Sequence, residues 1–228
     1  MISLLIVFPQ KQNRKSSPFV QIKQETIDCR SKQSPYSSAG FLMKNFYTPG
    51  PNELQSLKQI AFDFTQQFAR KVPGFVELDS HDQTLLIRNA CLEVYTLFFA
   101  YRNTSGASSC WFSDCLELAR HDCELFFGEW FFAMQEFAQR LQAIQIDQQS
   151  FVSLLAIALI SERFGLTDSR KVELLQMRLI DTLRDHVTYD SEAQRKPHYF
   201  SKLFSILPAL RSFSALVEPN LTQETGLY

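Results

Sequence analysis

Four side chains of the kind that bind metals fall within one short segment, Cys110, Cys115, His121 and Cys123. Zinc prefers thiolate and imidazole ligands, but a structural site needs four that converge and usually includes a C-x₂-C pair, which this segment lacks. We therefore expect no metal here and interpret the cysteines as small apolar residues packed in the interior. A metal-dependent enzyme is the alternative, and metal analysis would reveal it.

Motifs for other kinds of catalysis are absent from the sequence, which has no Gly-rich phosphate loop, no G-x-S-x-G and no H-E-x-x-H. Its 23 basic and 24 acidic residues give a net charge of -1, which is not the footprint of a nucleic-acid-binding surface. We predict that the chain is not an enzyme, uses no cofactor and does not bind DNA directly.

Beyond its first turn, the segment 80–102 contains three charged residues, although it is apolar on almost every side and therefore typical of a helix in the middle of a protein. They are Arg88, Glu93 and Arg102. A buried charge is costly unless it is paired or met by a ligand. These three residues are therefore the first candidates for a function or for a buried ion pair.

The elements that hold these residues are predicted to be helical. Asn52 is expected to cap an amphipathic helix that ends at Pro73, and Ser80, with Gln83 three residues on, is expected to cap the buried helix. The residues Cys110 to Phe112 are the only plausible strand.

From Asp114 onward the pattern is helical again. Asp147 is expected to cap a helix that ends at Gly165, and Asp168 to cap the next. In the last helix, Pro197 would occupy the first turn and Pro208 would bend the axis. These patterns predict an all-α fold with a short β-turn near 103–113.

Short motifs in a fixed order carry a family resemblance. They are Phe68-Ala69-Arg70, Pro73, Phe75, Leu78, Asp82-Gln83, Leu85-Leu86, Arg88, Cys91-Leu92-Glu93, Ala100-Tyr101-Arg102, Phe127-Gly128-Glu129-Trp130, Glu162-Arg163, Gly165-Leu166, Asp185-His186-Val187-Thr188, Ser201-Lys202-Leu203, Leu207-Pro208 and Leu210-Arg211. Together they resemble the ligand-binding domain of nuclear receptors, most closely the nerve-growth-factor-induced-B group of orphan receptors. The resemblance runs from about residue 52 to Arg211 and implies a layered antiparallel helical sandwich.

The resemblance also implies a ligand pocket, lined by Leu54, Ala61, Leu92, Tyr95, Phe99, Arg102, Phe112, Phe127 and Trp130. Arg102 would anchor a ligand's acid or carbonyl oxygen; otherwise it pairs with a carboxylate or caps backbone carbonyls. Because the chain contains 21 phenylalanines and aromatic rings fill large volumes, we expect side chains to occupy the pocket and a small-molecule ligand to be absent. A lipid or hormone sensor with a real cavity is the alternative.

Two protein-binding surfaces follow from the same resemblance. The coregulator groove would contain Gln66, Arg70, Lys71, Ser80, Gln83, Thr84, Ile87 and Arg88, a set too polar for ordinary helix-in-groove binding. The dimerisation helix would present Tyr199, Lys202, Leu203, Ile206, Leu210 and Arg211 to a retinoid X-type receptor or to a second copy, although a stripe at this spacing is more often core. Glu93 would form the buried ion pair, with Arg163 or Arg211 as its partner.

The length of 228 residues suits one domain, which we place at 49–217 between a flexible tail at 1–48 and a tail at 218–228. Five irregularly spaced cysteines favour free thiols, and no apolar run is long enough to span a membrane. Neither a twin-zinc DNA-binding module nor the family's activation helix is recognisable. The chain is interpreted as an incomplete nuclear receptor form that regulates transcription through protein contacts, as a dominant-negative or partner-sequestering isoform would.

Overall fold

The structure is a computed structural model that describes residues 51–103, 107–113 and 116–212, without the side chains of 51–56, 113, 116, 126 and 129. The tails expected at 1–48 and 218–228 lie outside the described residues. Within the described part, no helix combines the length and the apolar character needed to cross a membrane.

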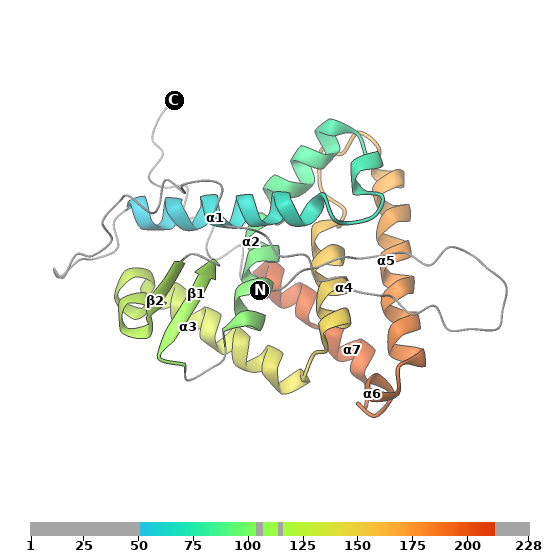
Figure 1. The fold of residues 1–228 in the computed structure, drawn as a ribbon. Coiled ribbons are helices and arrows are strands. Elements are labelled where there is room, and N and C mark those ends of the chain that lie inside the picture. Colours follow the sequence, from blue (N-terminus) through green and yellow to red (C-terminus); the bar gives the residue numbers. More distant parts are fainter. Residues whose placement is uncertain (1–50, 104–106, 114–115, 213–228) are drawn as a thin grey trace.

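Helix α2 (Ser80–Arg102) is the centre of the fold, and every residue from Glu93 to Ala100 is buried. Helix α1 (Pro51–Ala69) lies across one side of it, and α3 (Arg120–Ile144) and α4 (Gln148–Leu159) contact it elsewhere (Figure 1). A helix apolar all round needs cover on several faces, and these three neighbours supply it.

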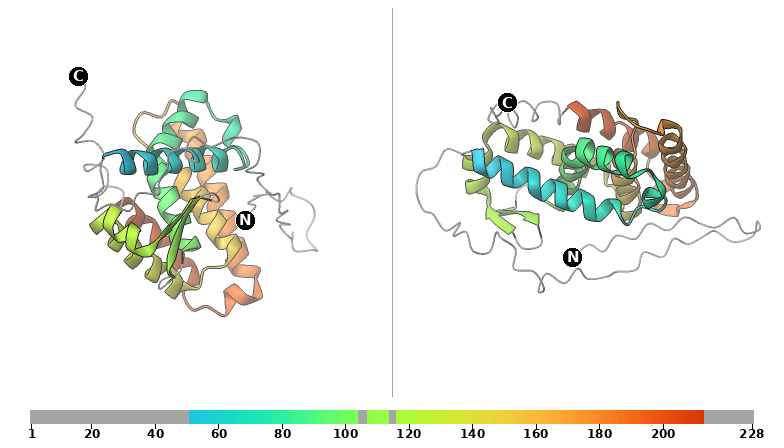
Figure 2. Two further views of the ribbon diagram at one scale, coloured as in Figure 1. Left: turned by 60° about the vertical axis from the view of Figure 1, so that its left-hand side comes forward. Right: turned by 90° about the horizontal axis from the view of Figure 1, so that it is seen from above.

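The helices form three layers. Helices α2, α4 and α5 (Ser169–Tyr189) make up the middle layer, with α1 on one side and α3 with α7 (Tyr199–Phe204) on the other (Figures 1 and 2). The short α6 (Ser191–Gln194) joins α5 to α7. The predicted all-α layered sandwich is confirmed.

A two-stranded antiparallel sheet packs at the end of the buried helix. Strand β1 (Ser109–Ser113) pairs with β2 (Leu116–Ala119), with a bulge between Trp111 and Ser113. The first strand was predicted, but the expectation of a helical pattern from Asp114 is wrong for the second. Its Leu-Glu-Leu-Ala sequence alternates with the period of a strand, and pairing with β1 satisfies its backbone.

The cap predicted for α2 is wrong. Asp79 caps this helix, accepting a hydrogen bond from the His81 backbone N–H at 2.8 Å. Ser80 is the first helical residue, and the Gln83 amide donates to the Val76 and Leu78 carbonyls of the short 3-10 helix η3 (Phe75–Glu77) and the residue after it. Asp79 and the adjacent Ser80 could each cap the helix, and the folded chain uses the Asp79 carboxylate.

The boundaries of the other helices agree with the sequence in part. Asp147 and Asp168 cap α4 and α5 as predicted, accepting hydrogen bonds from the backbone N–H groups of Ser150 and Lys171. Helix α1 starts at Pro51, before the predicted cap at Asn52, and α4 ends at Leu159, well before Gly165.

The last helical segment is interrupted at Ser205, three residues before Pro208. Helix α7 begins at Tyr199, so Pro197 is not in its first turn, and it ends at Phe204 before helical structure resumes over 206–212. Pro208 has no N–H to donate to the carbonyl of Phe204 four residues earlier, and its ring crowds that carbonyl. The predicted bend is therefore present as a break at Ser205.

Candidate functional site

Eight aromatic rings form one connected group between α1, α2, β1 and α3, which we call the aromatic cluster. Its members are Phe64, Phe68, Tyr95, Phe98, Phe99, Phe112, Phe127 and Trp130. The ring centroids of Phe64 and Phe98 are 4.1 Å apart, and those of Phe99 and Phe112 are 4.9 Å apart. Such offset and edge contacts add about 0.5–1.5 kcal/mol each to the burial of the rings.

A hydrogen bond fixes the strand against the central helix within this cluster. The Tyr95 hydroxyl donates to the Phe112 backbone carbonyl at 2.7 Å, and both side chains are buried. Burial raises the pKa of Tyr95 well above its usual value, despite the opposing effect of Arg102. The hydroxyl therefore stays protonated and remains a donor at neutral pH.

Asn103, which the sequence interpretation treated only as the start of a turn, also positions the strand. Its amide nitrogen donates to the carbonyls of Phe99 and Trp111 at 3.0 Å, and its oxygen accepts from the Trp111 backbone N–H at 2.7 Å. One side chain thereby ends α2 and holds β1 beside it. A side-chain amide offers both donors and an acceptor, and this property was the only indication in the sequence that Asn103 could hold the strand.

Arg102 lies at the edge of the aromatic cluster. Its guanidinium carbon is 5.8 Å from the Phe98 ring centroid and 5.6 Å from that of Trp111, distances at which a cation is attracted to a ring face. The sequence interpretation considered a ligand oxygen, a carboxylate or backbone carbonyls as partners, and it missed these two rings.

The five aromatic residues assigned to the pocket are linked by ring contacts in the folded chain. Ala61, Tyr95, Phe99 and Phe112 are buried, whereas Leu92, Arg102, Phe127 and Trp130 are half-buried, and the side chain of Leu54 lies outside the described residues. Phe127 contacts both Phe112, at 5.2 Å, and Trp130, at 5.5 Å between centroids. Gly128 follows Phe127 with φ 46° and ψ -127°, a conformation suited to glycine that redirects α3 next to these rings.

The residues assigned to the coregulator groove lie along the end of α1 and the start of α2. Arg70, Ser80, Thr84 and Arg88 are exposed, while Gln66, Lys71 and Gln83 are half-buried. Ile87, the apolar member of the set, is 7% exposed and belongs to the core. The Thr84 hydroxyl donates to the Ser80 carbonyl at 2.9 Å, so part of this polar surface is bonded within its own helix.

Glu93 pairs with Arg163, one of the two partners that the sequence left open. The Arg163 guanidinium donates to the Glu93 carboxylate at 2.7 Å, and these side chains are 17% and 6% exposed. Arg163 belongs to the loop between α4 and α5, so the pair ties this loop to the central helix. Arg88, which the sequence interpretation grouped with Glu93 and Arg102, is exposed and carries no burial cost.

The side chain of Asp82 binds the backbone of the same loop. The carboxylate accepts from the N–H groups of Thr167 and Asp168 at 2.7 Å and 3.0 Å, and the side chain is buried. Burial by itself raises the pKa of Asp82, but these N–H groups hold the net value below its ordinary range. Asp82, the first residue of the Asp-Gln motif of the family resemblance, is therefore an anchor for the loop before α5.

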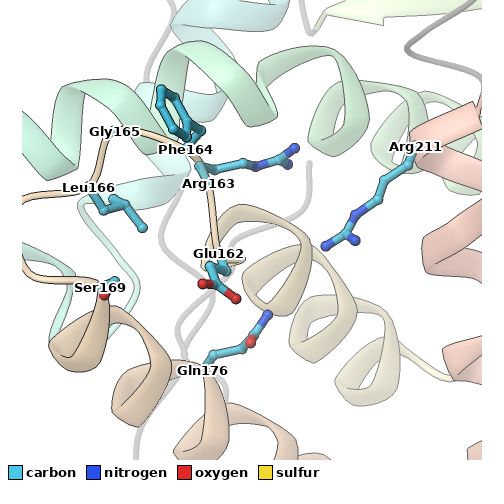
Figure 3. A pocket seen from close by; sticks show the side chains of 8 residues that line it. All are labelled: Glu162, Arg163, Phe164, Gly165, Leu166, Ser169, Gln176 and Arg211. Atoms are coloured by element: carbon cyan, nitrogen blue, oxygen red, sulfur yellow. The ribbon is translucent and has the colours of Figure 1, made fainter.

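A cleft of about 610 Å³ lies beside this loop and is lined by Glu162, Arg163, Phe164, Gly165, Leu166, Ser169, Gln176 and Arg211. Arg163 and Arg211 enter it from opposite sides, and Gln176 of α5 lies next to Glu162 of the loop (Figure 3). Phe164 is fully exposed at its rim. The sequence interpretation did not identify this cleft, because it forms only where Arg211 lies beside residues 162–176, which are at least 35 positions earlier in the chain.

The residues assigned to the dimerisation helix divide between the core and the surface of this chain. Tyr199, Leu203, Ile206 and Leu210 are buried in the core of this chain, whereas Lys202 and Arg211 are exposed. The stripe faces inward because α7 and the following segment cover α3 and α5 with it. Four of the six assigned residues therefore have no surface to offer a partner in this conformation.

The described residues contain no group of three or more His, Cys, Asp or Glu side chains that could hold a metal ion. Cys110 and Cys123 are buried free thiols, and Cys115 lies outside the described residues.

The chain matches a recognised protein family. Residues 43–221 match the family model for the ligand-binding domain of nuclear hormone receptors. The chain therefore belongs to that family, and the match extends beyond both ends of the region that carried the resemblance.

Curated relatives support the same assignment. The probable nuclear hormone receptor HR38 of Drosophila melanogaster is 46% identical over 152 residues, which are 67% of this chain and 14% of that protein. Nuclear receptor subfamily 4 group A member 2 of Xenopus tropicalis is 32% identical over 192 residues, 82% of this chain and 32% of the relative. Group A member 1 of Xenopus laevis is 36% identical over 152 residues, 67% of this chain and 26% of the relative.

The chain thus spans less than a third of the length of these relatives. The matches confirm the recognised receptor family and its orphan group, and they agree with a domain that takes part in transcription regulation in the nucleus.

Proposed function

We propose that this orphan-receptor domain regulates transcription through contacts with other proteins, with its interior occupied by its own side chains instead of a hormone. The proposal assigns it no catalysis and no direct contact with DNA. The aromatic cluster is the observation that carries it. Rings from α1, α2, β1 and α3 contact one another from Phe64 to Trp130 in the region assigned to the ligand pocket.

The environment of Arg102 supports a filled interior. A ligand-anchoring arginine needs its guanidinium directed at the ligand's oxygen, so that a charge-assisted hydrogen bond can form. Here the guanidinium lies near the rings of Phe98 and Trp111. A ligand would have to displace ring contacts to reach it, which lowers the net gain of binding.

The surface formed by Arg70, Ser80, Thr84 and Arg88 is too polar for the usual binding of a Leu-rich coregulator helix. A Leu-rich amphipathic helix gains affinity by burying its apolar face in an apolar groove. The exposed members of this set are charged or hydroxylic, and Ile87 is already in the core. We therefore propose that coregulators bind here through polar contacts or bind elsewhere on the domain.

The partner-binding surface that we propose lies around the cleft at Arg211. Lys202 and Arg211 are exposed, and Phe164 presents a fully exposed ring at the rim. Exposed arginine and aromatic side chains are typical anchors of protein interfaces. The partner proposed from the family resemblance is a retinoid X-type receptor or a second copy of this chain.

Native mass spectrometry of the 228-residue chain, purified and then incubated with a mixture of fatty acids and sterols, tests the filled interior. We expect the mass of the protein alone. A stoichiometric apolar ligand would contradict the proposal and support the lipid- or hormone-sensor alternative.

Analytical ultracentrifugation with a retinoid X-type ligand-binding domain tests the partner surface. We expect a complex that the Arg211→Glu and Phe164→Ala variants weaken, while Lys58→Glu, on the exposed side of α1, leaves it unchanged. If neither hetero-complex nor self-association forms, the partner-sequestering role is excluded. If a complex forms and represses a reporter in cells, loss of repression with Arg211→Glu would support that role.

A further inference from the structure

Two buried thiols lie beside a ring contact in the aromatic cluster. Cys110 and Phe112 are buried on one face of β1, with the partly exposed Trp111 between them. Cys123 and Phe127 are one turn apart on α3 and therefore share a helix face. Because the rings of Phe112 and Phe127 are 5.2 Å apart, this face of the strand packs against this face of the helix.

The two cysteines precede the two rings in the same direction along the chain. Two residues along a strand and four along a helix both advance by about 6–7 Å. The Arg120 backbone N–H donates to the Ser108 carbonyl at 2.9 Å, so α3 begins beside the start of β1. From this point the strand and the helix advance together to the contact of Phe112 with Phe127, which places Cys110 near Cys123.

Leu118 provides a second, independent link between the thiols. Cys110 is paired with Leu118 across the sheet, and the Cys123 Sγ lies 4.0 Å from the Leu118 carbonyl oxygen. Both thiols thus lie at the same point of the hairpin. Neither is part of a disulfide in this structure.

The surroundings make the two sulfurs chemically unequal. The neighbouring Cys123 thiol lowers the pKa of Cys110, with a further decrease from the positive charge of Arg120, against the effect of burial. The same neighbour, together with burial, raises the pKa of Cys123. A more acidic thiol beside a less acidic one is the arrangement of an attacking cysteine and a resolving cysteine.

We propose that Cys110 and Cys123 form a redox-sensitive dithiol, which a hydroperoxide converts into a disulfide between β1 and α3. The Cys110 thiolate attacks the peroxide, so that an S–O bond forms, the O–O bond breaks and hydroxide or alkoxide leaves. The Cys123 sulfur then attacks the Cys110 sulfenic acid, which forms the S–S bond, breaks the S–O bond and releases water with the Cys123 proton. In total the two thiols lose two electrons and two protons. Hydrogen peroxide is reduced to two molecules of water, and an organic hydroperoxide is reduced to water and an alcohol.

Burial of both sulfurs controls the rate of this reaction. Peroxide reaches Cys110 only when the hairpin opens locally, and short edge elements open at lower free energy than the core. Oxidation is therefore slower than for an exposed thiol but selective for this pair. The disulfide would fix the Phe112–Phe127 contact and raise the thermal unfolding midpoint, because it restricts the unfolded chain.

The test uses the reduced 228-residue chain, which contains five cysteines. After treatment with hydrogen peroxide, remaining thiols are blocked with N-ethylmaleimide and the digested protein is analysed by mass spectrometry. We expect a linked peptide containing Cys110 and Cys123, lighter than the two separate peptides by two hydrogen atoms and separated again by dithiothreitol. The same treatment in urea should scatter the linkages over other cysteine pairs.

Single variants test the roles of the two sulfurs. In Cys123→Ser, Cys110 should accumulate as a sulfenic acid that dimedone labels, whereas Cys110→Ser should show much less label at Cys123. Cys91→Ser, which removes a buried thiol outside the pair, should give the wild-type yield of the linked peptide. Recovery of Cys110 and Cys123 as unlinked thiols, or linkage mainly through Cys29, Cys91 or Cys115, would overturn the proposal. The wild-type measurement decides even if a variant does not fold.

Discussion

The hydroxyl of Tyr199 donates to the Asp147 carboxylate at 2.7 Å and accepts the Asp147 backbone N–H at 3.0 Å. Asp147 also caps α4 through Ser150 and lies 3.0 Å from His186 Nε2 of α5. One carboxylate therefore connects α4, α5 and α7. Burial raises the pKa of Tyr199 to about 12, so its hydroxyl remains a donor across the physiological range.

Replacing Tyr199 with phenylalanine should destabilise the domain by about 1–3 kcal/mol, because the Asp147 N–H and carboxylate each lose a partner in a half-buried site. Urea unfolding followed by circular dichroism measures the change. Tyr189→Phe is the matched control, since the Tyr189 side chain is 74% exposed and its loss of a hydroxyl should have no effect. Equal stability of Tyr199→Phe and wild type would show that this hydroxyl does not hold α7 in place.

Replacing Asp147 with asparagine should change the response of the domain to acid. Burial raises the pKa of Asp147, but hydrogen bonds from His186, Ser150 and Tyr199 outweigh it and hold the pKa well below the ordinary value. The folded state thus binds this proton more weakly than the unfolded state does. The stabilisation is fully present above the unfolded pKa of about 3.9 and is lost as the pH falls below it.

We therefore expect Asp147→Asn to be less stable than wild type by roughly 1–3 kcal/mol at neutral pH, with the difference shrinking below about pH 4. Urea unfolding at a series of pH values measures this convergence. Asp181→Asn changes an exposed carboxylate that pairs with Arg184, and it should give a small difference at every pH. A difference for Asp147→Asn that does not decrease in acid would contradict the assignment.

Much of the helical framework could be predicted from the sequence because its signals are local. The apolar periodicity located the main helices, and Asp147 and Asp168 marked the starts of α4 and α5. Asp79 was missed because Ser80 is also a good cap, and only the folded backbone decides between neighbours. Strand β2 was missed because four alternating residues are too few to distinguish from a helix start.

The sites depend on contacts between distant segments, which a single sequence does not contain. The sequence predicted an ion pair for Glu93 but did not decide between Arg163 and Arg211 as its partner. Asp82 holds the loop before α5 against α2, and Arg163 of this loop forms the pair. The spacing of the apolar stripe from Tyr199 to Leu210 is more often that of a core than of an interface, but it does not decide between them, and in the folded chain these residues are buried. The contact of Arg102 with the Trp111 ring requires β1 to fold back beside α2, which the Asn103 side chain brings about.

Removing one partner of the Glu93–Arg163 pair should destabilise the domain strongly. Glu93→Gln leaves a largely buried guanidinium without its counter-charge, which typically costs roughly 3–5 kcal/mol. The double variant Glu93→Leu/Arg163→Met should lose less than the sum of the single variants, because it leaves no unpaired charge. A cycle of thermal or urea unfolding measurements tests this.

Glu192→Gln is the control for this cycle, since Glu192 and Arg195 form an ion pair with side chains 70% and 74% exposed. We expect no measurable change from it. Additive effects of the two substitutions at Glu93 and Arg163 would show that the pair itself contributes little.

Replacing Phe99 with alanine should create the cavity that we propose this domain lacks. The Phe99 ring contacts those of Tyr95, Phe112 and Trp130, and its side chain is 3% exposed. A large-to-small change at such a site costs about 3–5 kcal/mol and leaves an apolar space that small hydrophobic molecules can enter. Calorimetric titration with a small aromatic hydrocarbon should therefore detect binding to Phe99→Ala but not to wild type or to Phe132→Ala, whose ring is 58% exposed. Binding of the hydrocarbon to the wild-type domain with equal affinity would mean that room already exists beside Arg102, and the interior would then be a ligand site instead of a packed core.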